Sequence, residues 1–182
     1  MKKNLQRLID IPSGAQVEMH GNGITVKGSG KEFHRVFDLG KVKMTHGEGK
    51  IKIHAEKATK RESRMIGTVN AHVRNMIRGL SKEFIYKLEV ASVHFPMVVK
   101  VDEAKKVLVI KTFLGEKADR HAKILPGATV EIKGTEITVK SHDKEIAGQT
   151  VANIEKATRV KGRDRRIFQD GIFLTERCGH KI

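Results

Sequence analysis

The segment "ITVKGSGKE" at residues 24–32 is nearly repeated as "ITVKSHDKE" at residues 137–145. With a constant offset of 113 residues, the longer segments 14–33 and 127–146 are identical at 11 of 20 positions. In both segments apolar residues alternate with polar ones, a period typical of strands that bury one face. The repetition therefore predicts an internal duplication that contains β-hairpins.

The first half of the chain has the pattern of two hairpins, a helix and a strand. After the hairpin within residues 14–33, a second alternating segment over 41–55 predicts another hairpin. Apolar residues at helical spacing then predict a helix over 59–78, with Gly79 as its stop. Alternation returns over residues 84–90 and predicts a strand there.

Two short motifs predict where these elements turn or begin. Asn22-Gly23 favours the two-residue turn of the first hairpin. Thr59, followed three residues later by Glu62, has the pattern of a capping box, in which each side chain binds the other residue's backbone. We therefore expect the first helix to begin at this pair.

The second half of the chain offers the same parts. Alternation predicts hairpins over 97–111 and 128–140, helical spacing predicts a helix over 143–158, and a short strand is expected over 171–174. Aligning the two predicted helices requires an offset of 81 residues, which conflicts with the offset of 113 for the repeated "ITVK". We therefore prefer the order of hairpin, hairpin, helix and strand in each half. On this interpretation the repeated "ITVK" arises partly because hairpin strands in both halves favour the same kinds of residue, and only partly from the duplication.

These patterns predict an α+β fold of two similar modules, each an antiparallel sheet built from hairpins with one helix packed on a face. We place the boundary between the modules near "ASVHFP" at residues 91–96. The expected domains are an N-terminal module over 1–91 and a C-terminal module over 92–182.

The chain is strongly basic. It contains 36 Lys and Arg against 21 Asp and Glu, a formal net charge of +15, which points to a polyanion as partner. Aromatic residues make up only 4% and Trp is absent, which disfavours stacking on single-stranded bases as the main binding mode. No apolar run is long enough to span a membrane, the N-terminus lacks a signal-peptide pattern, and the single cysteine fits a reducing cytosol.

The first of the repeated segments resembles a phosphate-binding loop only in its letters. A Walker loop has a glycine, four other residues and then Gly-Lys-Ser/Thr, and it leads into a helix N-terminus. Here Gly30-Lys31 is followed by Glu32, and Thr25 stands where the first glycine belongs. Because residues 31–37 have a strand pattern, we interpret the segment as a tight glycine turn between strands.

Other patterns of catalytic residues fail on geometry. Ser141, His142 and Asp143 are adjacent, whereas a triad needs its base between its partners, so we expect Ser141 or Asp143 to cap the second helix. Cys178 and His180 lie too near the end of the chain for burial to align them, and the sequence has no zinc-binding spacing. We therefore expect no catalytic, cofactor-binding or metal-binding residues, and no enzyme activity.

Basic residues concentrate in two segments, one on or beside the first predicted helix and one from Lys156 to the end. The second segment is denser in arginine, whose guanidinium suits phosphate oxygens better than an ammonium does. A solvated surface remains an alternative for both segments. The candidate contacts in the second segment are Arg159, Lys161, Arg163, Arg165, Arg166, Arg177 and Lys181. Those of the first segment are Arg61, Arg64, Arg74 and Arg78.

Three stretches, which together cover most of the chain, resemble a known protein family. They are "PSGAQVEMHGNGITVKGSGKEFHRVF", "RMIGTVNAHVRNMIRGLSKEFIYKLEVASVHFP" and "LPGATVEIKGTEITVKSHDKEIAGQTVANIEKATRVKGRDRRIFQDGIFLTE". In this order they resemble large-subunit ribosomal protein six. The stretch "KGRDRRIFQDGIF" is similar to the archaeal and eukaryotic branch, and the compact length favours the archaeal type.

The resemblance implies two similar α/β modules and binding to large-subunit rRNA, chiefly through the C-terminal module. The implied location is near the sarcin-ricin loop and the base of the stalk, where translation factors dock. Implied partners are the rRNA, neighbouring ribosomal proteins and, nearby, translation factors, in the cytoplasmic ribosome and without a cofactor, a small-molecule substrate or a membrane.

Residue roles carry over from the same resemblance. The matching "RVKGRDRR" stretch implies rRNA contacts by Arg159, Lys161, Arg163, Arg165 and Arg166, with Arg177 and Lys181 as further candidates. The clustering of charge, rather than the resemblance, makes the arginines of the first helix candidates for secondary contacts to RNA or protein.

Two other classes of protein stay open at this point. A free-standing basic RNA-binding protein or RNA chaperone would share the charge but should bind RNA and DNA alike. A phosphate-handling enzyme would need a nucleotide pocket, which titration with magnesium nucleotides would detect.

Overall fold

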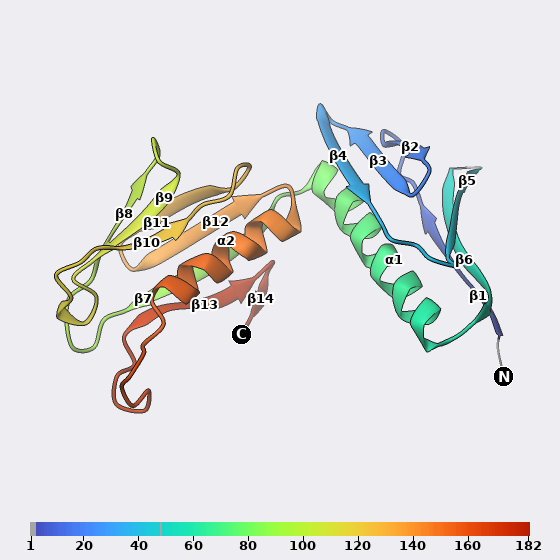
Figure 1. Cartoon of the computed structure of the whole chain (residues 1–182). Helices are drawn as coiled ribbons and strands as arrows, with labels where there is room; N and C mark the ends of the chain where they lie inside the picture. The colour runs from blue at the N-terminus through green and yellow to red at the C-terminus, as the bar shows by residue number, and fades with distance from the viewer. Residues whose placement is uncertain (1–2, 48) are drawn as a thin grey trace. The chain divides into compact units, whose positions relative to one another are not determined.

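Residues 3–47 and 49–182 are described by a computed structural model, in which the chain divides into two units between Lys82 and Glu83 (Figure 1). Each unit has its own cluster of buried apolar side chains. The α+β class with two similar modules is confirmed, because each unit combines antiparallel sheets with one α-helix. The division lies before the predicted boundary near residue 91.

The first unit contains two three-stranded antiparallel sheets, with strand orders β1-β6-β5 and β2-β3-β4. Its elements are β1 (Lys3–Asp10), β2 (Gln16–His20), β3 (Gly23–Gly28), β4 (Lys31–Val36), β5 (Lys43–Gly47), β6 (Lys50–Ala58) and α1 (Lys60–Ser81). The predicted hairpins and helix are therefore present. Strand β1 was not predicted, because its residues lie before the first clear alternation.

Helix α1 packs its apolar side against both sheets of the first unit. Ile66, Val69 and Val73 are buried on that side and belong to the same core as Ile51 and Ile53 of β6. Apolar burial of this kind stabilises by roughly 25 cal/mol per Å² of surface removed from water. The helical spacing read from the sequence thus identifies the buried side of α1 correctly.

The capping box at the start of α1 is confirmed, but the predicted stop is wrong. The amide of Thr59 donates to Glu62 Oε2 at 2.7 Å, and Thr59 Oγ1 accepts from the amide of Arg61 at 3.3 Å. Gly79 does not end the helix, which continues to Ser81 with Gly79 buried inside it. The buried Leu80, 6% exposed, explains the difference, because its contact with the core holds the last turn in helical form.

The turn of the first hairpin lies one residue earlier than Asn22-Gly23. His20 pairs with Gly23 across the hairpin, so Gly21 and Asn22 form the two-residue loop. Gly21 has a φ of 59°, a left-handed conformation that glycine adopts at little cost. The glycine before the asparagine, rather than the one after it, therefore sets the register of the hairpin.

The second unit contains a three-stranded sheet of order β10-β9-β8 and a five-stranded sheet of order β11-β12-β7-β13-β14. Its elements are β7 (Phe84–Ala91), β8 (Val98–Asp102), β9 (Val107–Lys111), the short 3₁₀ helix η1 (Phe113–Gly115), β10 (Arg120–Lys123), β11 (Thr129–Lys133), β12 (Glu136–Ser141), α2 (Lys144–Ala157), β13 (Gly171–Arg177) and β14 (His180–Lys181). Helix α2 lies against β7, β10, β12 and β13.

Strand β7 explains why the units divide before residue 84. It lies between β12 and β13, so that Leu88 pairs with Ile137 on one side and Leu174 on the other. Phe84, Tyr86, Leu88 and Val90 share one face of β7 and are all buried in the core of the second unit. The predicted order of hairpin, hairpin, helix and strand is therefore wrong in one respect, since β7 opens the second unit and does not close the first.

The two units repeat the same order of elements. Strand β1 corresponds to β7, the sheet β2-β3-β4 to β8-β9-β10, the hairpin β5-β6 to β11-β12, and α1 to α2. Lys3 of β1 and Phe84 of β7 begin their strands 81 residues apart, the same offset that aligns the helices. The repeated "ITVK" instead lies in β3 and β12, which do not occupy equivalent positions in the two units. This repetition therefore reflects the residues that hairpin strands favour, and not the duplication.

Within residues 3–47 and 49–182, neither helix combines the length and the apolar character needed to cross a bilayer.

Candidate nucleic-acid interface

Residues 158–170, which connect α2 to β13, form the segment named here the C-terminal loop. Buried polar groups hold both of its ends. At the start, Thr158 Oγ1 accepts from the amide of Ile172 at 3.0 Å and donates to the carbonyl of Glu155 at 3.3 Å. At the end, Asp170 accepts from the amides of Val93 and His94 at 2.7 and 2.9 Å. The loop therefore leaves the unit and returns to it at fixed points.

Asp170 is only 2% exposed, and its charge is nevertheless well compensated. Burial by itself raises the pKa of the Asp170 carboxyl, but hydrogen bonds from the His94 amide and ring and from the Val93 amide outweigh it and lower the pKa. The His94 Nδ1 atom lies 2.6 Å from Asp170 Oδ2. An ionised carboxylate thus ties the C-terminal loop to the segment that follows β7.

A stack of side chains continues from this anchor along the loop. The ring of Phe168 stacks on His94, with a centroid distance of 4.9 Å and an interplanar angle of 29°. The guanidinium of Arg163 lies 4.7 Å from the centroid of Phe168. Since cations are attracted to aromatic faces, this contact holds the Arg163 guanidinium over the Phe168 ring.

Asp164 organises the tip of the C-terminal loop. Its carboxylate accepts from the Arg166 amide at 2.9 Å and pairs with the Arg166 guanidinium at the same distance, which lowers the pKa of Asp164. Its carbonyl accepts from the amides of Ile167 and Phe168, which closes a turn. The tip is therefore ordered by local bonds, although its basic side chains are exposed.

Arg120 of β10 binds the backbone where α2 ends and the C-terminal loop begins. Its Nη1 atom donates to the carbonyls of Ala157 and Arg159 at 2.9 and 3.3 Å, where α2 ends. Two bonds of 2.6 and 2.7 Å to Glu116 hold the guanidinium and lower the pKa of that carboxyl. Its guanidinium carbon also lies 4.1 Å from the centroid of the Phe113 ring. Sequence reasoning missed Arg120, because a single arginine in a short strand gives no signal.

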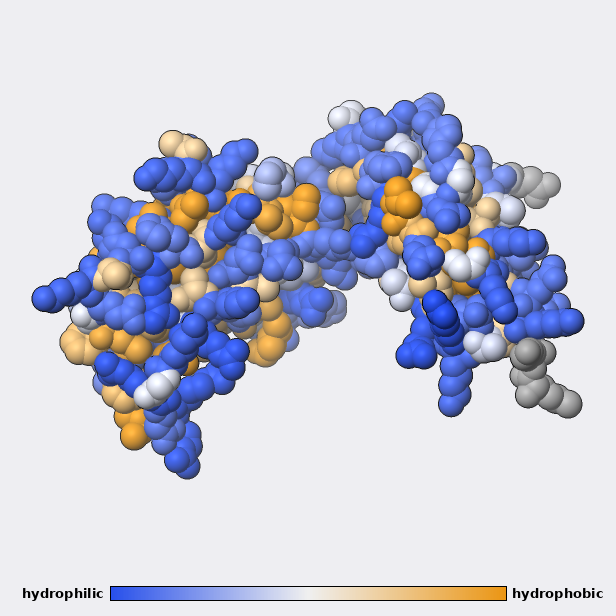
Figure 2. Space-filling model, viewed as in Figure 1, coloured by the Kyte–Doolittle hydropathy of each residue, from blue (hydrophilic) through white to orange (hydrophobic). Residues whose placement is uncertain are grey.

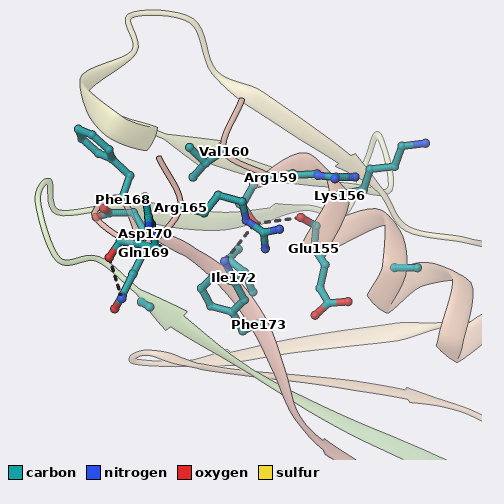
Figure 3. A pocket seen from close by; sticks show the side chains of 14 residues that line it. Glu155, Lys156, Arg159, Val160, Arg165, Phe168, Gln169, Asp170, Ile172 and Phe173 are labelled. Atoms are coloured by element: carbon teal, nitrogen blue, oxygen red, sulfur yellow. Dashed lines mark hydrogen bonds between the residues drawn. The ribbon is translucent and has the colours of Figure 1, made fainter. Parts of the chain in front are cut away.

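A pocket of about 910 Å³ lies between the C-terminal loop, the end of α2 and the start of β13 (Figure 3). Its lining includes the basic side chains of Lys156, Arg159, Arg165 and Arg166, together with the aromatic ring of Phe173. Hydrophilic side chains are interspersed with hydrophobic ones on the visible face of the second unit in Figure 2. Because Arg159, Arg165 and Arg166 belong to the C-terminal loop and also line the pocket, the loop and the pocket share one surface of the second unit.

Comparison with known proteins identifies the family. The model of the family described as ribosomal protein L6 matches this chain twice, at residues 11–83 and 95–171. The chain belongs to the ribosomal protein L6 family. The family consists of structural constituents of the ribosome and not of enzymes. The second matched range includes the C-terminal loop.

Individual relatives agree with this result. The large ribosomal subunit protein uL6 of Methanobrevibacter smithii is 45% identical over 91% of this chain and 92% of its own length. The uL6 proteins of Methanococcus vannielii and Methanothrix thermoacetophila are each 42% identical, over 94% and 97% of this chain and 93% and 99% of their own lengths.

The predicted contact residues do not all lie together. Arg159, Lys161, Arg163, Arg165 and Arg166 are exposed on the C-terminal loop. Arg177 and Lys181 are also exposed, but they lie at the far end of β13 and on β14. A seven-residue strand spans about 20 Å, so Arg177 and Lys181 lie apart from the C-terminal loop on the second unit.

The arginines of the first segment lie on α1, in the first unit. Arg61, Arg64, Arg74 and Arg78 are all exposed on α1. They therefore belong to a different unit from the C-terminal loop. The family resemblance assigns them no contact of their own.

Ser141, His142 and Asp143 have separate structural roles. Ser141 Oγ donates to the carbonyl of Gly127 at 2.8 Å, and the His142 ring lies 3.0 Å from Glu83. Asp143 caps α2 by accepting from the amide of Glu145 at 2.8 Å, as predicted. Among the described residues, no group of three or more His, Cys, Asp or Glu side chains is placed to hold a metal ion.

Proposed function

We propose that this chain binds large-subunit rRNA through the C-terminal loop, near the sarcin-ricin loop and the base of the stalk, and so supports the region where translation factors dock. The family resemblance supplies the location. The observation that carries the proposal is the loop itself, in which five exposed basic residues project from a segment whose two ends are held by Thr158 and Asp170.

The physical argument is one of preorganised charge. Arginine side chains so close in sequence repel one another, and phosphate oxygens relieve that repulsion while accepting charged hydrogen bonds. Because the loop is fixed before binding, less conformational entropy is lost when RNA binds. A-form RNA presents a shallow minor groove and its phosphates, so recognition by shape and charge suits a protein with few aromatic residues.

The same proposal covers the protein partners. Neighbouring ribosomal proteins at the base of the stalk, with translation factors close by, are the partners that the family resemblance implies, in the cytoplasmic ribosome. The exposed arginines of α1 are proposed as secondary contacts, to RNA or to such a protein.

The decisive experiment compares two triple variants of equal charge. One replaces Arg163, Arg165 and Arg166 with Ala, and the other replaces Arg61, Arg64 and Arg74 of α1. We expect the loop variant to bind large-subunit rRNA at least about 30-fold more weakly than the unmodified chain, since a charged hydrogen bond contributes about 1.5–3 kcal/mol before solvent screening. The α1 variant should lose less than about five-fold.

Both variants should keep the circular dichroism and melting temperature of the unmodified chain, because the replaced side chains are exposed. Salt dependence gives a second readout. The logarithm of affinity should fall with the logarithm of salt at a slope of very roughly −4 to −7, and the loop variant should reduce its magnitude by about 2 to 3. Equal losses from the two variants would mean that total charge, rather than the C-terminal loop, drives binding.

A further inference from the structure

We propose that the pocket beside the C-terminal loop receives one unpaired nucleotide of the bound RNA, with its base on the ring of Phe173 and its phosphate against the arginines of the rim. This inference rests on the proposed function, because RNA is its ligand. It adds a specific site to a surface that otherwise recognises only charge and shape.

The dimensions of the pocket fit such a ligand. Its volume of about 910 Å³ lies near the upper end of the range of about 300–1,000 Å³ that is typical of small-molecule sites. The walls come from the end of α2, from the C-terminal loop and from β13, all within the second unit (Figure 3). One nucleotide can therefore enter without displacing an element.

Phe173 provides the stacking surface. It is 43% exposed, whereas its neighbour Ile172 is 1% exposed and lies in the core. A side chain at Gly171 would put its Cβ atom 3.0 and 3.2 Å from atoms of the Phe173 ring. The glycine thus lets the ring tip rest on the backbone, which restrains the ring while leaving much of it open to a ligand.

The rim provides charge for a phosphate. Arg166 is already paired with Asp164, but Arg159 and Arg165 have no carboxylate partner among the described residues. The acidic residues of the lining are Glu155 and Asp170, and both accept bonds from backbone amides, Glu155 from Leu174 at 2.9 Å and Asp170 from Val93 at 2.7 Å. Two uncompensated guanidinium groups beside an exposed aromatic ring are the combination that binds the base and the phosphate of an unstacked nucleotide.

The absence of Trp from the chain makes a direct test possible. The Phe173→Trp variant carries a single fluorescent reporter in the pocket, and the Phe33→Trp variant carries one in β4 of the first unit as a matched control. Both are titrated with in vitro transcribed large-subunit rRNA. We expect RNA to quench the emission of the Phe173→Trp variant strongly, because a base stacks on the indole, and to leave that of the Phe33→Trp variant nearly unchanged.

Affinity provides the second arm. The Phe173→Leu variant, which keeps an apolar side chain, should bind the rRNA about ten-fold more weakly, while the Phe33→Leu variant should bind as the unmodified chain does. Equal quenching in the two tryptophan variants, or full affinity of the Phe173→Leu variant, would overturn the pocket assignment even though RNA is bound. If the unmodified chain does not bind the rRNA, the proposed function itself fails, and the two failures are distinguished.

Discussion

Strands β1 and β7 hold equivalent places in the two units, yet one is an edge strand and the other a central strand. β1 pairs only with β6 among the described strands, whereas β7 pairs with both β12 and β13. The residues that face the helix differ accordingly. Leu5 is 36% exposed and Arg7 is exposed in β1, while the corresponding Tyr86 and Leu88 of β7 are 3% and 0% exposed.

The difference shows how a repeated fold can be given a new surface. In the first unit the chain leaves α1 and passes directly into β7. In the second unit it leaves α2, forms the C-terminal loop and returns as β13, which covers the edge that β1 leaves open in the first unit. The basic loop thus belongs to the part of the second unit that has no counterpart in the first. An arginine on the inner face of β1 also protects that edge from pairing with other chains.

The largest effect expected from this comparison is on stability. The Leu88→Ala variant should lose about 2–5 kcal/mol in the free energy of unfolding of the second unit, because it leaves a cavity in the core beneath the central strand of the sheet. The Leu5→Ala variant makes the same chemical change on β1 and should cost less than about 1 kcal/mol. Urea unfolding of the full chain, followed by circular dichroism, measures both. Similar losses in the two variants would mean that β1 is as well packed as β7.

An intermediate effect is expected at the anchor of the C-terminal loop, which the first unit lacks. The Asp170→Asn variant should lose about 2 kcal/mol of stability at pH 7, since charged hydrogen bonds from two amides and the His94 ring are weakened. Because folding lowers the pKa of Asp170, its contribution is present above the unfolded pKa near 3.9 and is lost as the pH falls through the folded value. The difference from the unmodified chain should therefore shrink below about pH 4.

The control for this prediction is Asp102→Asn, at a turn where the carboxylate accepts a single amide bond of 3.1 Å from Lys105. It should cost little at any pH, because an asparagine oxygen can accept the same bond. Thermal melting over a pH series compares the two variants. A constant difference between pH 7 and pH 3 would show that the charge of Asp170 is not what anchors the loop.

The smallest effect expected concerns the starts of the two helices. α1 begins with the reciprocal pair Thr59 and Glu62, whereas α2 has the single cap Asp143. The Thr59→Ala variant should lose about 1 kcal/mol in the free energy of unfolding, because the cap of α1 is removed.

The pH dependence of the same cap depends on Glu62. Bonds from the Thr59 side chain and amide lower the pKa of Glu62, so its contribution to stability is present above its unfolded pKa and disappears as the pH falls through its folded pKa. The difference in melting temperature between the Glu62→Gln variant and the unmodified chain should therefore shrink in acid. A difference that stayed constant as the pH fell would contradict this prediction.

The elements of the fold were predictable where the signal is local. Helical spacing identified both helices, alternation identified the main hairpins, and Thr59 with Glu62 marked the start of α1. The partners of β7 were not predictable, because alternation shows that a strand buries one face but not which strands lie beside it. The unit boundary was misplaced for that reason alone.

The same distinction holds for the candidate site. Clustered arginines are visible in the sequence, so the loop residues from Arg159 to Arg166 could be named in advance. The groups that position these arginines could not be predicted from the sequence, since His94 and Asp170 are 76 residues apart and Arg120 lies in a separate sheet. The pocket around Phe173 was missed because it forms only when β13 folds back beside the end of α2.

Cross-linking in assembled large ribosomal subunits tests the central claim most directly. Subunits that contain this chain are irradiated with ultraviolet light, digested with protease and nuclease, and the peptides that carry RNA are identified by mass spectrometry. The account predicts that cross-links concentrate in peptides of the C-terminal loop and the start of β13, residues 158–173, with few in α1. Cross-links that lie mainly in α1, with residues 158–173 unmodified, would contradict the assignment of rRNA binding to the second unit.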